Sequence, residues 1–210
     1  MNITVTVMAH PKRKVAAEAL ELELSKYPFA DVSITWDEVN EEWETGARAL
    51  RGGSADCGWH LVVQDDAILS PDFYNNIVGA IAAAPSKSLI SLYTGTARPL
   101  GKRVKNAVDK AYHATWLQYW LLLWGVAVLI PSDHIEPMLD FVEDREELYD
   151  TRIGIFYQRN RLPIYYTMPS LVDHDDDLGS LLGHGQAPEP RVAHRVATGP
   201  VAWNNKVINI

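Results

Sequence analysis

The residues best suited to chemistry are two adjacent carboxylates, Asp65 and Asp66, which directly follow an apolar run. Two ionised carboxylates side by side repel each other, and a divalent cation with oxygen ligands relieves that repulsion. Asp also commonly ends strands and opens turns in solvent, and the pair alone fits this structural role equally well. The pair is therefore a candidate cation site, and the surrounding secondary structure decides whether a ligand could reach it.

These elements read as a strand and a helix. Residues 59–63 have the length and the β-branched content of a buried strand. A Ser-Pro pair follows and predicts a helix over residues 72–84, because proline is favoured in the first helical turn. Ligands of open α/β sheets bind beyond the carboxyl ends of the strands. Gln64, Asp65 and Asp66 are thus expected where a polar substrate is held.

The first fifty residues alternate in the same way. Residues 2–8 and 31–36 predict strands, residues 14–26 between them predict a helix, and residues 41–50 predict a second helix. A strand, a helix and a strand of these lengths imply a parallel pair with a right-handed crossover. No Gly-x-Gly-x-x-Gly follows the first strand, so the dinucleotide-binding fingerprint is absent.

Residues 114–130 are the most hydrophobic stretch, near the roughly 20 residues that a membrane span needs. Gln118 and Gly125 interrupt the stretch, and Pro131 follows it at once. We therefore interpret it as a helix that ends near Tyr119 and a buried strand over residues 122–130. The other elements expected in this half are a strand over 87–93, helices over 132–141 and from Tyr149, and a last strand over 162–167.

Composition sets the broad class. The chain has 210 residues, 47% hydrophobic and 22% charged, which suits one folded α/β domain. A formal net charge of −8 argues against a protein that coats nucleic acid or an anionic membrane through its overall field. The single Cys57 excludes an internal disulfide and a cysteine-based zinc site. The first residues alternate like a strand and lack the pattern of a signal peptide, so a cytoplasmic protein is expected.

The strand followed by Gln64-Asp65-Asp66-Ala67 resembles the GT-A-type glycosyltransferases, in particular small bacterial and phage enzymes with an Asp-x-Asp-like signature. Residues 169–174, Pro-Ser-Leu-Val-Asp-His, are similar to a run that small family members carry after their final strand. The resemblance implies an α/β fold, a GT-A-like Rossmann-type sandwich with a mostly parallel central sheet flanked by helices. It covers residues 1–182 and leaves 183–210 as an irregular C-terminal tail packed on or covering the site.

The resemblance also implies a donor and a metal. Asp66 and His174 are expected to hold a divalent ion, Mn²⁺ or Mg²⁺, while Gln64 stands where the signature has its leading acid. The donor implied is a nucleotide sugar, specifically a UDP-sugar. Residues expected to bind it are His10, Arg13, Asp37, Arg48 (with Arg51 as the alternative) and Asp65.

On the acceptor side, the resemblance nominates Asp150 as the base that takes the acceptor proton. Asp150 is equally suited to capping the helix that begins there. A basic segment over residues 98–110 and an aromatic series suggest a polyanionic acceptor, such as modified DNA or a phosphorylated or lipid-linked glycan. A solvated helix face and a packed aromatic core are the alternatives. The acceptor residues nominated are Arg103, Lys105, Trp120, Trp124 and Gly125.

The expected function is therefore metal-dependent transfer of a sugar from a nucleotide-sugar donor. One alternative is a nucleotidyltransferase, although the residues after the first strand, His10 to Arg13, are a poor match to a phosphate-binding loop. The other is a non-catalytic module that binds a nucleotide sugar or a glycan, which the replacement of an acid by Gln64 would suit.

Overall fold

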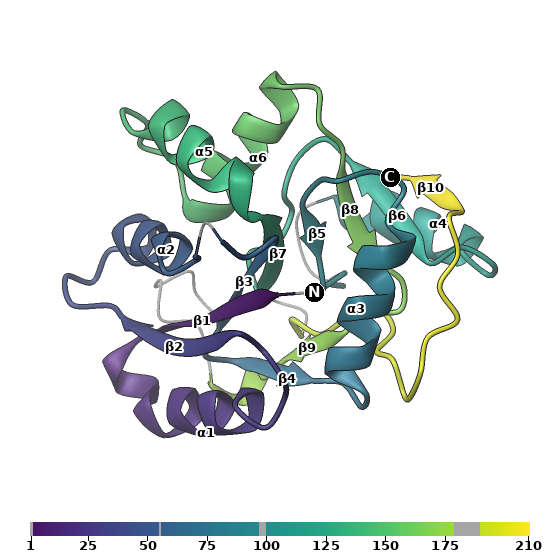
Figure 1. Cartoon of the computed structure of the whole chain (residues 1–210). Coiled ribbons are helices and arrows are strands. Elements are labelled where there is room, and N and C mark those ends of the chain that lie inside the picture. Colours follow the sequence, from purple (N-terminus) through teal and green to yellow (C-terminus); the bar gives the residue numbers. More distant parts are fainter. Residues whose placement is uncertain (1, 55, 97–99, 179–189) are drawn as a thin grey trace.

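The computed structural model describes residues 2–54, 56–96, 100–178 and 190–210. Within these ranges an eight-stranded sheet has the order β10-β6-β8-β5-β7-β3-β1-β2 (Figure 1). The strands are β1 (Ile3–Ala9), β2 (Asp31–Trp36), β3 (Trp59–Gln64), β5 (Ile90–Ser91), β6 (Trp116–Tyr119), β7 (Ala127–Pro131), β8 (Ile164–Thr167) and β10 (Val207–Asn209). A separate pair joins β4 (Ala67–Leu69) to β9 (Val172–His174).

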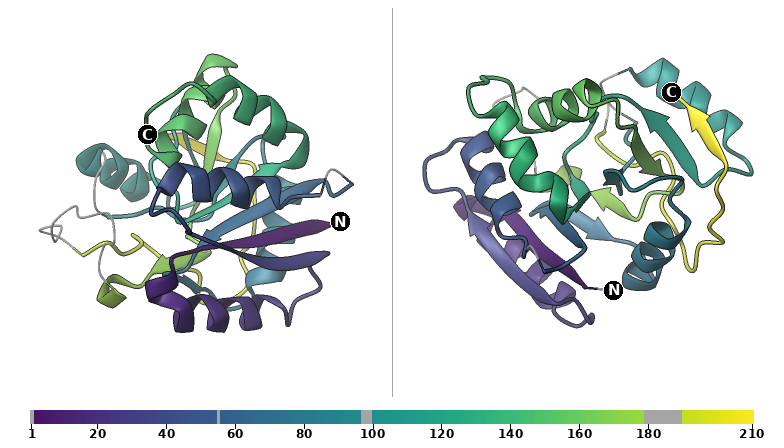
Figure 2. Two further views of the ribbon diagram at one scale, coloured as in Figure 1. Left: turned by 90° about the vertical axis from the view of Figure 1, so that its left-hand side faces the viewer. Right: turned by 45° about the horizontal axis from the view of Figure 1, so that its top comes forward.

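The helices are α1 (Lys14–Leu24), α2 (Glu42–Arg51), α3 (Phe73–Ala83), α4 (Gly101–Lys110), α5 (Ile135–Val142) and α6 (Tyr149–Arg159). Short 3₁₀ turns are η1 (Pro11–Arg13), η2 (Ser132–His134) and η3 (Asp176–Leu178). Helices α1 and α2 lie on opposite faces of β1 and β2, so the strands between them are covered on both sides (Figure 2). This layering confirms the predicted α/β class.

The sheet is mixed, with parallel pairing slightly ahead. In the described ranges β1 pairs in parallel with β2 and with β3, β5 with β8, and β6 with β10. The β3–β7, β5–β7 and β6–β8 pairings are antiparallel. Every residue of β1 is buried, as expected for a strand covered on both faces.

The βαβ unit predicted at the N-terminus is confirmed. Strand β2 has the predicted bounds, and α1 ends two residues before the predicted end. Strand β3 likewise ends at Gln64, immediately before the two carboxylates. The hydrophobic pattern was informative here because each element buries one clear face or both.

The prediction of a helix ending near Tyr119 is wrong. Trp116–Tyr119 is strand β6, which pairs with β8 on one side and β10 on the other. The three tryptophans at 116, 120 and 124 have helical spacing by coincidence, since each lies in a different local structure. In the described part of the chain, no helix is long and apolar enough to cross a membrane.

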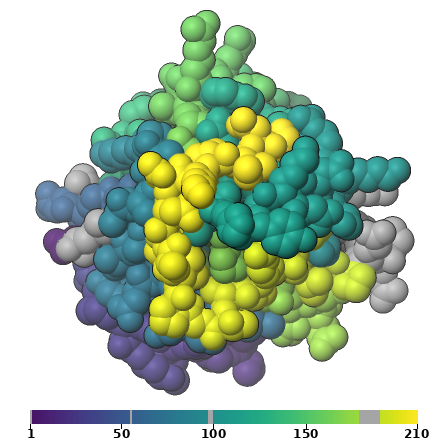
Figure 3. Space-filling view, turned by 90° about the vertical axis from the view of Figure 1, so that its right-hand side faces the viewer, coloured from purple at the N-terminus to yellow at the C-terminus, as the bar shows by residue number. Residues whose placement is uncertain are grey.

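The described part of the C-terminal segment, residues 190–210, is mostly irregular and carries one short strand, β10. Its strand β10 forms an edge of the sheet, and Figure 3 shows this segment, in yellow, lying across one face of the molecule. The Trp203 ring packs close to Gly79 of α3, and Asn76 of the same helix accepts a hydrogen bond from the Val201 amide at 2.9 Å. The boundary predicted at residue 182 lies outside the described residues.

Candidate active site

The short β4–β9 pair positions the two predicted metal ligands. The antiparallel register sets Ala67 opposite His174, so Asp66 lies beside the end of β9. The Asp175 amide donates to the Asp66 carbonyl at 2.7 Å and closes this junction. As a result, His174 Nε2 lies 3.2 Å from Asp66 Oδ2, although the two residues are far apart in sequence.

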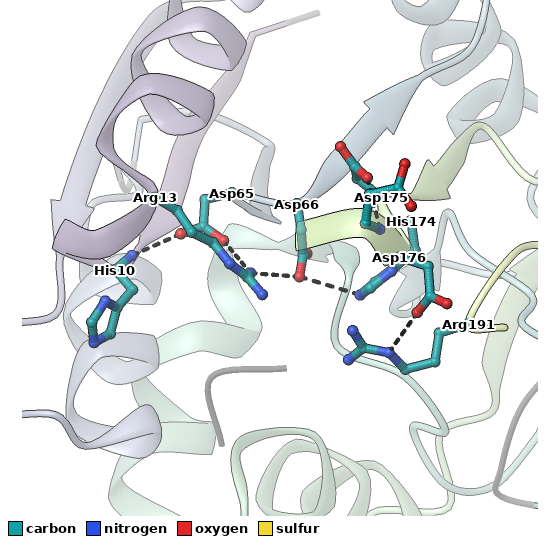
Figure 4. A network of polar contacts seen from close by, with 9 residues as sticks. His10, Arg13, Asp65, Asp66, His174, Asp175, Asp176 and Arg191 are labelled. Atoms are coloured by element: carbon teal, nitrogen blue, oxygen red, sulfur yellow. Dashed lines mark hydrogen bonds and ion pairs between the residues drawn. The ribbon is translucent and has the colours of Figure 1, made fainter. Parts of the chain in front are cut away.

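Arg13 joins the two carboxylates from the turn that follows β1 (Figure 4). Its Nη1 lies 2.8 Å from Asp65 Oδ1 and 2.6 Å from Asp66 Oδ2. The His10 amide donates to Asp65 Oδ2 at 2.8 Å. All three side chains of this ion-pair group are nearly buried, so their charges are compensated by one another rather than by water.

The compensation differs between the two carboxyls. Burial alone would raise the pKa of Asp66, but the hydrogen bond and charge of His174, together with Arg13, outweigh it and lower that pKa. Burial raises the pKa of Asp65, and the His10 amide and Arg13 only partly offset it. Asp66 is therefore the more strongly ionised of the two.

These groups open into a cavity of about 380 Å³. Six of the predicted site residues line it: His10, Arg13, Asp37, Asp65, Asp66 and His174. Arg191 of the C-terminal segment also lines it and pairs with Asp176 at 3.1 Å. A contiguous, charged cavity at the carboxyl ends of β1, β2 and β3 is where ligands of open α/β sheets bind.

Asp37 and Arg48, both predicted to bind the nucleotide sugar, also make contacts that stabilise the fold. Asp37 lines the cavity and accepts hydrogen bonds from the Val39 and Glu41 amides at 3.2 Å, which orders the loop before α2. Arg48 does not line it. The Arg48 guanidinium instead donates to the Trp36 carbonyl at 2.8 Å and so ties α2 to the end of β2.

A second group of carboxyls lies where α2 packs against α6. Glu42 lines the cavity, and burial followed by the charge of Asp150 raises the pKa of Glu42 to about 7. Burial also raises the pKa of Asp150. The Tyr149 hydroxyl is buried and has no hydrogen-bond partner in the described part of the chain.

Asp150, the predicted base, does not line the cavity; Glu42 does. Asp150 is the second residue of α6, whose N-cap is Leu148, so the expected capping position is two residues too late in the chain. The Tyr149 ring fills the space beside Gly46 and Gly125, where an added Cβ would come within 2.3 Å and 2.9 Å of it. Gly125 thus admits this ring.

The predicted acceptor residues lie apart from the cavity lining. Arg103 and Lys105 are exposed on α4; Arg103 contacts the Tyr119 ring and the Ile210 carbonyl, and Lys105 pairs with Asp109. Trp120 is 44% exposed and free to stack on a ligand. Trp124 is buried and packs edge-on against Tyr93 and Tyr166, which is a core position. Arg98 lies outside the described residues.

Sequence reasoning missed part of the cavity wall. Glu42 and Thr45 are three residues apart in a predicted helix and so share a face, which was an available signal. Asn40 and Arg191 lie in loops, where spacing carries no such information. These four residues line the same cavity as the two aspartates.

The residues present fit a divalent ion held partly by a ligand. Asp66 Oδ1 and His174 Nδ1 are buried without partners in the described ranges, so both side chains retain capacity for another contact. No group of three or more His, Cys, Asp or Glu side chains suited to a metal occurs among the described residues. Mg²⁺ and Mn²⁺ often bind through one or two protein side chains plus substrate phosphates, which this pair allows.

No protein-family model and no curated protein matches the sequence. Among solved structures, the chain is similar to a mutant Drosophila β-1,4-galactosyltransferase 7 in complex with manganese, UDP-galactose and xylobiose. The identity is 8%, the match covers 90% of this chain and 76% of that one, and the TM-score is 0.50. A glycosyltransferase involved in the glycosylation of the major capsid of PBCV-1 matches with 10% identity, 79% and 81% coverage and a TM-score of 0.46. At this identity the likeness concerns the fold, which is GT-A-like.

Proposed function

We propose that this chain is a glycosyltransferase that moves a sugar from a nucleotide-sugar donor to an acceptor hydroxyl. The observation that carries the proposal is the convergence of Asp66, His174 and Arg13 in one cavity at the carboxyl ends of parallel strands. A GT-A-like fold supports it, because ligands of open α/β sheets bind at this edge of the sheet. The similar galactosyltransferase structure holds UDP-galactose and manganese, which favours a UDP-sugar as the donor here.

Asp66 and His174 would hold the divalent ion, Mn²⁺ or Mg²⁺. Such an ion neutralises the charge that develops on a departing diphosphate. Arg13 places a positive charge between the two aspartates and so compensates these carboxylates. His10, Asp37 and Asp65 would contact the nucleoside and ribose.

Asp150 is the proposed base for the acceptor hydroxyl. Asp150 is a half-buried residue of α6, and burial raises its pKa toward the range useful for proton transfer. Burial, followed by the charge of Asp150, raises the pKa of the neighbouring Glu42 to about 7. We propose that Asp150 accepts the acceptor proton in its ionised form.

The acceptor is proposed to be polyanionic, with Arg103, Lys105 and Trp120 at its binding surface. Two cationic side chains and an indole are exposed along α4 and just after β6. Phosphate binds Lys and Arg, while bases and sugars stack on tryptophan.

A second candidate is a module that binds the nucleotide sugar without transferring it. Gln64 lines the cavity at the position where the signature has its leading acid, and this favours the second candidate because one carboxylate fewer remains to hold a metal.

One experiment separates the two candidates. Thermal shift with a panel of nucleotide sugars, with and without Mn²⁺, should identify the donor, since a ligand that binds the native state raises the melting temperature. Release of free nucleotide from that donor, alone or with acceptors, is expected of the transferase. A donor that binds but is never hydrolysed or transferred would establish the module.

A further inference from the structure

Glu42 occupies an unusual place for a carboxyl group. It is the first residue of α2 and lines the same cavity as Asp65 and Asp66, so any ligand held there meets it. Glutamate in the first turn of a helix is normally stabilised in its charged form by the helix dipole. Here its Oε2 is buried and lacks a hydrogen-bond partner in the described part of the chain.

The neighbouring Thr45 points to a ligand independently. Thr45 is 1% exposed, lines the cavity, and its Oγ1 has no hydrogen-bond partner within the described ranges. A buried hydroxyl without a partner costs about 1–3 kcal/mol, so such groups are generally satisfied by a bound molecule or water. Glu42 and Thr45 share one face of α2 and together offer unused polar atoms to an occupant.

The charges around Glu42 favour its neutral form. Asp150 and Tyr149 of α6 interact electrostatically with Glu42. The other titratable groups that line the same cavity are His10, Arg13, Asp37, Asp65, Asp66, His174 and Arg191. Arg13 is committed to Asp65 and Asp66, and Arg152 lies over the Trp43 ring and donates to the Glu147 carbonyl. The buried side chains of α5, which also packs on α2, are apolar. Burial and the Asp150 charge together raise the pKa of Glu42 to about 7.

We propose that Glu42 binds the nucleoside part of the donor as a neutral carboxylic acid, donating a hydrogen bond from its O–H group. This inference rests on the proposed use of a nucleotide sugar. A neutral carboxyl has one donor and one acceptor, which can pair with adjacent donor and acceptor atoms on a base or ribose. A carboxylate loses the donor and adds a negative charge near a diphosphate. Donor affinity should therefore fall as the pH rises.

Isothermal calorimetry with UDP-glucose, GDP-mannose and ADP-glucose, in Mg²⁺, tests this. These diphosphates are esterified at both ends and lack the phosphate ionisation near pH 6 that would confuse the result. If only the neutral form of Glu42 binds, affinity for the preferred sugar falls about tenfold between about pH 6 and about pH 8. Metal binding to a histidine strengthens with pH, so it has the opposite sign.

Glu42→Gln keeps a donor N–H and an acceptor at the same place. Its affinity should stay within about twofold of the low-pH value of the unsubstituted chain and show no pH dependence. Glu44→Gln, on the exposed side of the same helix, is the matched control and should retain the tenfold fall.

The outcomes are distinguishable. Affinity that does not change with pH in the unsubstituted chain overturns the inference and leaves the proposed function intact. Loss of binding by Glu42→Gln at both pH values also overturns it, because Glu42 would then act as a charged acceptor. Failure of every nucleotide sugar to bind at either pH overturns the proposed function together with the inference.

Discussion

Two neighbouring pairs of carboxyl groups are compensated in different ways: Asp65 and Asp66 both line the cavity, whereas Glu42 lines it and its neighbour Asp150 does not. Asp65 and Asp66 have Arg13 between them, and Asp66 also contacts His174, so the pKa of Asp66 is lowered despite its burial. Glu42 and Asp150 have no ion-pair partner in the described residues, and the pKa of Glu42 rises to about 7. The residue types are alike. Asp66, which contacts both Arg13 and His174, is the carboxyl whose pKa is lowered, whereas burial outweighs Arg13 at Asp65 and acts at Glu42 without any cation partner within the described ranges.

The scaffold explains the difference. Strand β1 lies next to β3 in the sheet, and Arg13 is in the turn that follows β1. The Arg13 guanidinium therefore lies close to the end of β3. Glu42 and Asp150 come from two helices whose contact is filled by the Tyr149 ring and two glycines. Little space remains there for an arginine. The first pair is suited to phosphate and metal, and the second to proton transfer.

Removing the cation from the first pair should have the largest effect on stability. Arg13→Met removes the cation shared by two buried carboxylates and leaves them, among the described residues, only His174 and the His10 amide, so we expect a loss of about 3–5 kcal/mol in the free energy of unfolding at neutral pH. Urea denaturation measures it. Mg²⁺ should restore part of the loss, because an ion replaces the missing charge.

Lys14→Met is the control for that substitution. Its ammonium is 67% exposed, whereas the Arg13 side chain is 9% exposed, so its removal should change stability by less than about 0.5 kcal/mol. An Arg13→Met chain as stable as this control would contradict the contrast between the two carboxyl pairs.

The next effect concerns metal binding. Asp66→Asn removes the charge but keeps the shape, and we expect Mn²⁺-dependent donor affinity to fall about 100-fold or more, by loss of a direct ligand. Calorimetry with the donor, with and without Mn²⁺, measures it. Asp65→Asn should have a milder effect, because Asp65 has no contact with His174. If Asp65→Asn and Asp66→Asn lose equal donor affinity, both aspartates would be assigned to the metal site.

How far the sequence predicts this site depends on how its parts are connected. Strand β3, its terminal aspartates and the βαβ unit follow from local hydrophobic patterns. The meeting of Asp66 and His174 was expected only through a family resemblance, because it depends on the three-residue strands β4 and β9. The contact of Arg13 with both aspartates requires the register of β1 on β3, which no local pattern contains.

The same reason explains why the helix predicted to end near Tyr119 is wrong. Strand β6 is four residues long and is held by β8 and β10, which come much later in the chain. Its aromatic residues also carry a helical period by coincidence. Tertiary pairing outweighed local pattern there.

The pH dependence of the free energy of unfolding can test whether Glu42, in the second carboxyl pair, holds a proton in the folded state. The pKa of Glu42 is raised from 4.5 to about 7, so the folded state holds a proton that the unfolded state has released between these values. That stabilisation is complete below about pH 4.5 and is lost as the pH rises to about 7. The glutamine of Glu42→Gln does not titrate. Over this window the free energy of unfolding of the variant should therefore rise relative to that of the unsubstituted chain. The shift sets a limit of about 3 kcal/mol, and partial exposure reduces the expected gain to about 1 kcal/mol.

Thermal unfolding of both chains between about pH 4 and about pH 8 measures this gain, with Glu44→Gln as the control. A constant difference across the window would show that Glu42 ionises normally. The second pair would then behave as an ordinary exposed carboxyl group, and its contrast with Asp65 and Asp66 would disappear.

The smallest effect is expected from cations that are not engaged with the cavity carboxylates. Arg103 and Lys105 are exposed on α4, so replacing both with glutamine should leave stability and donor hydrolysis nearly unchanged. For a polyanionic acceptor, affinity at low salt should fall about tenfold, and the slope of log affinity against log salt should decrease by about 1.4–1.8, since each phosphate contact contributes about 0.7–0.9. Fluorescence anisotropy with labelled single-stranded DNA over a salt series measures both. Loss of donor binding instead would make α4 part of the diphosphate site, which would extend the cation-compensated region well beyond Arg13. No change in either quantity would leave α4 as a solvated face and exclude it from the acceptor site.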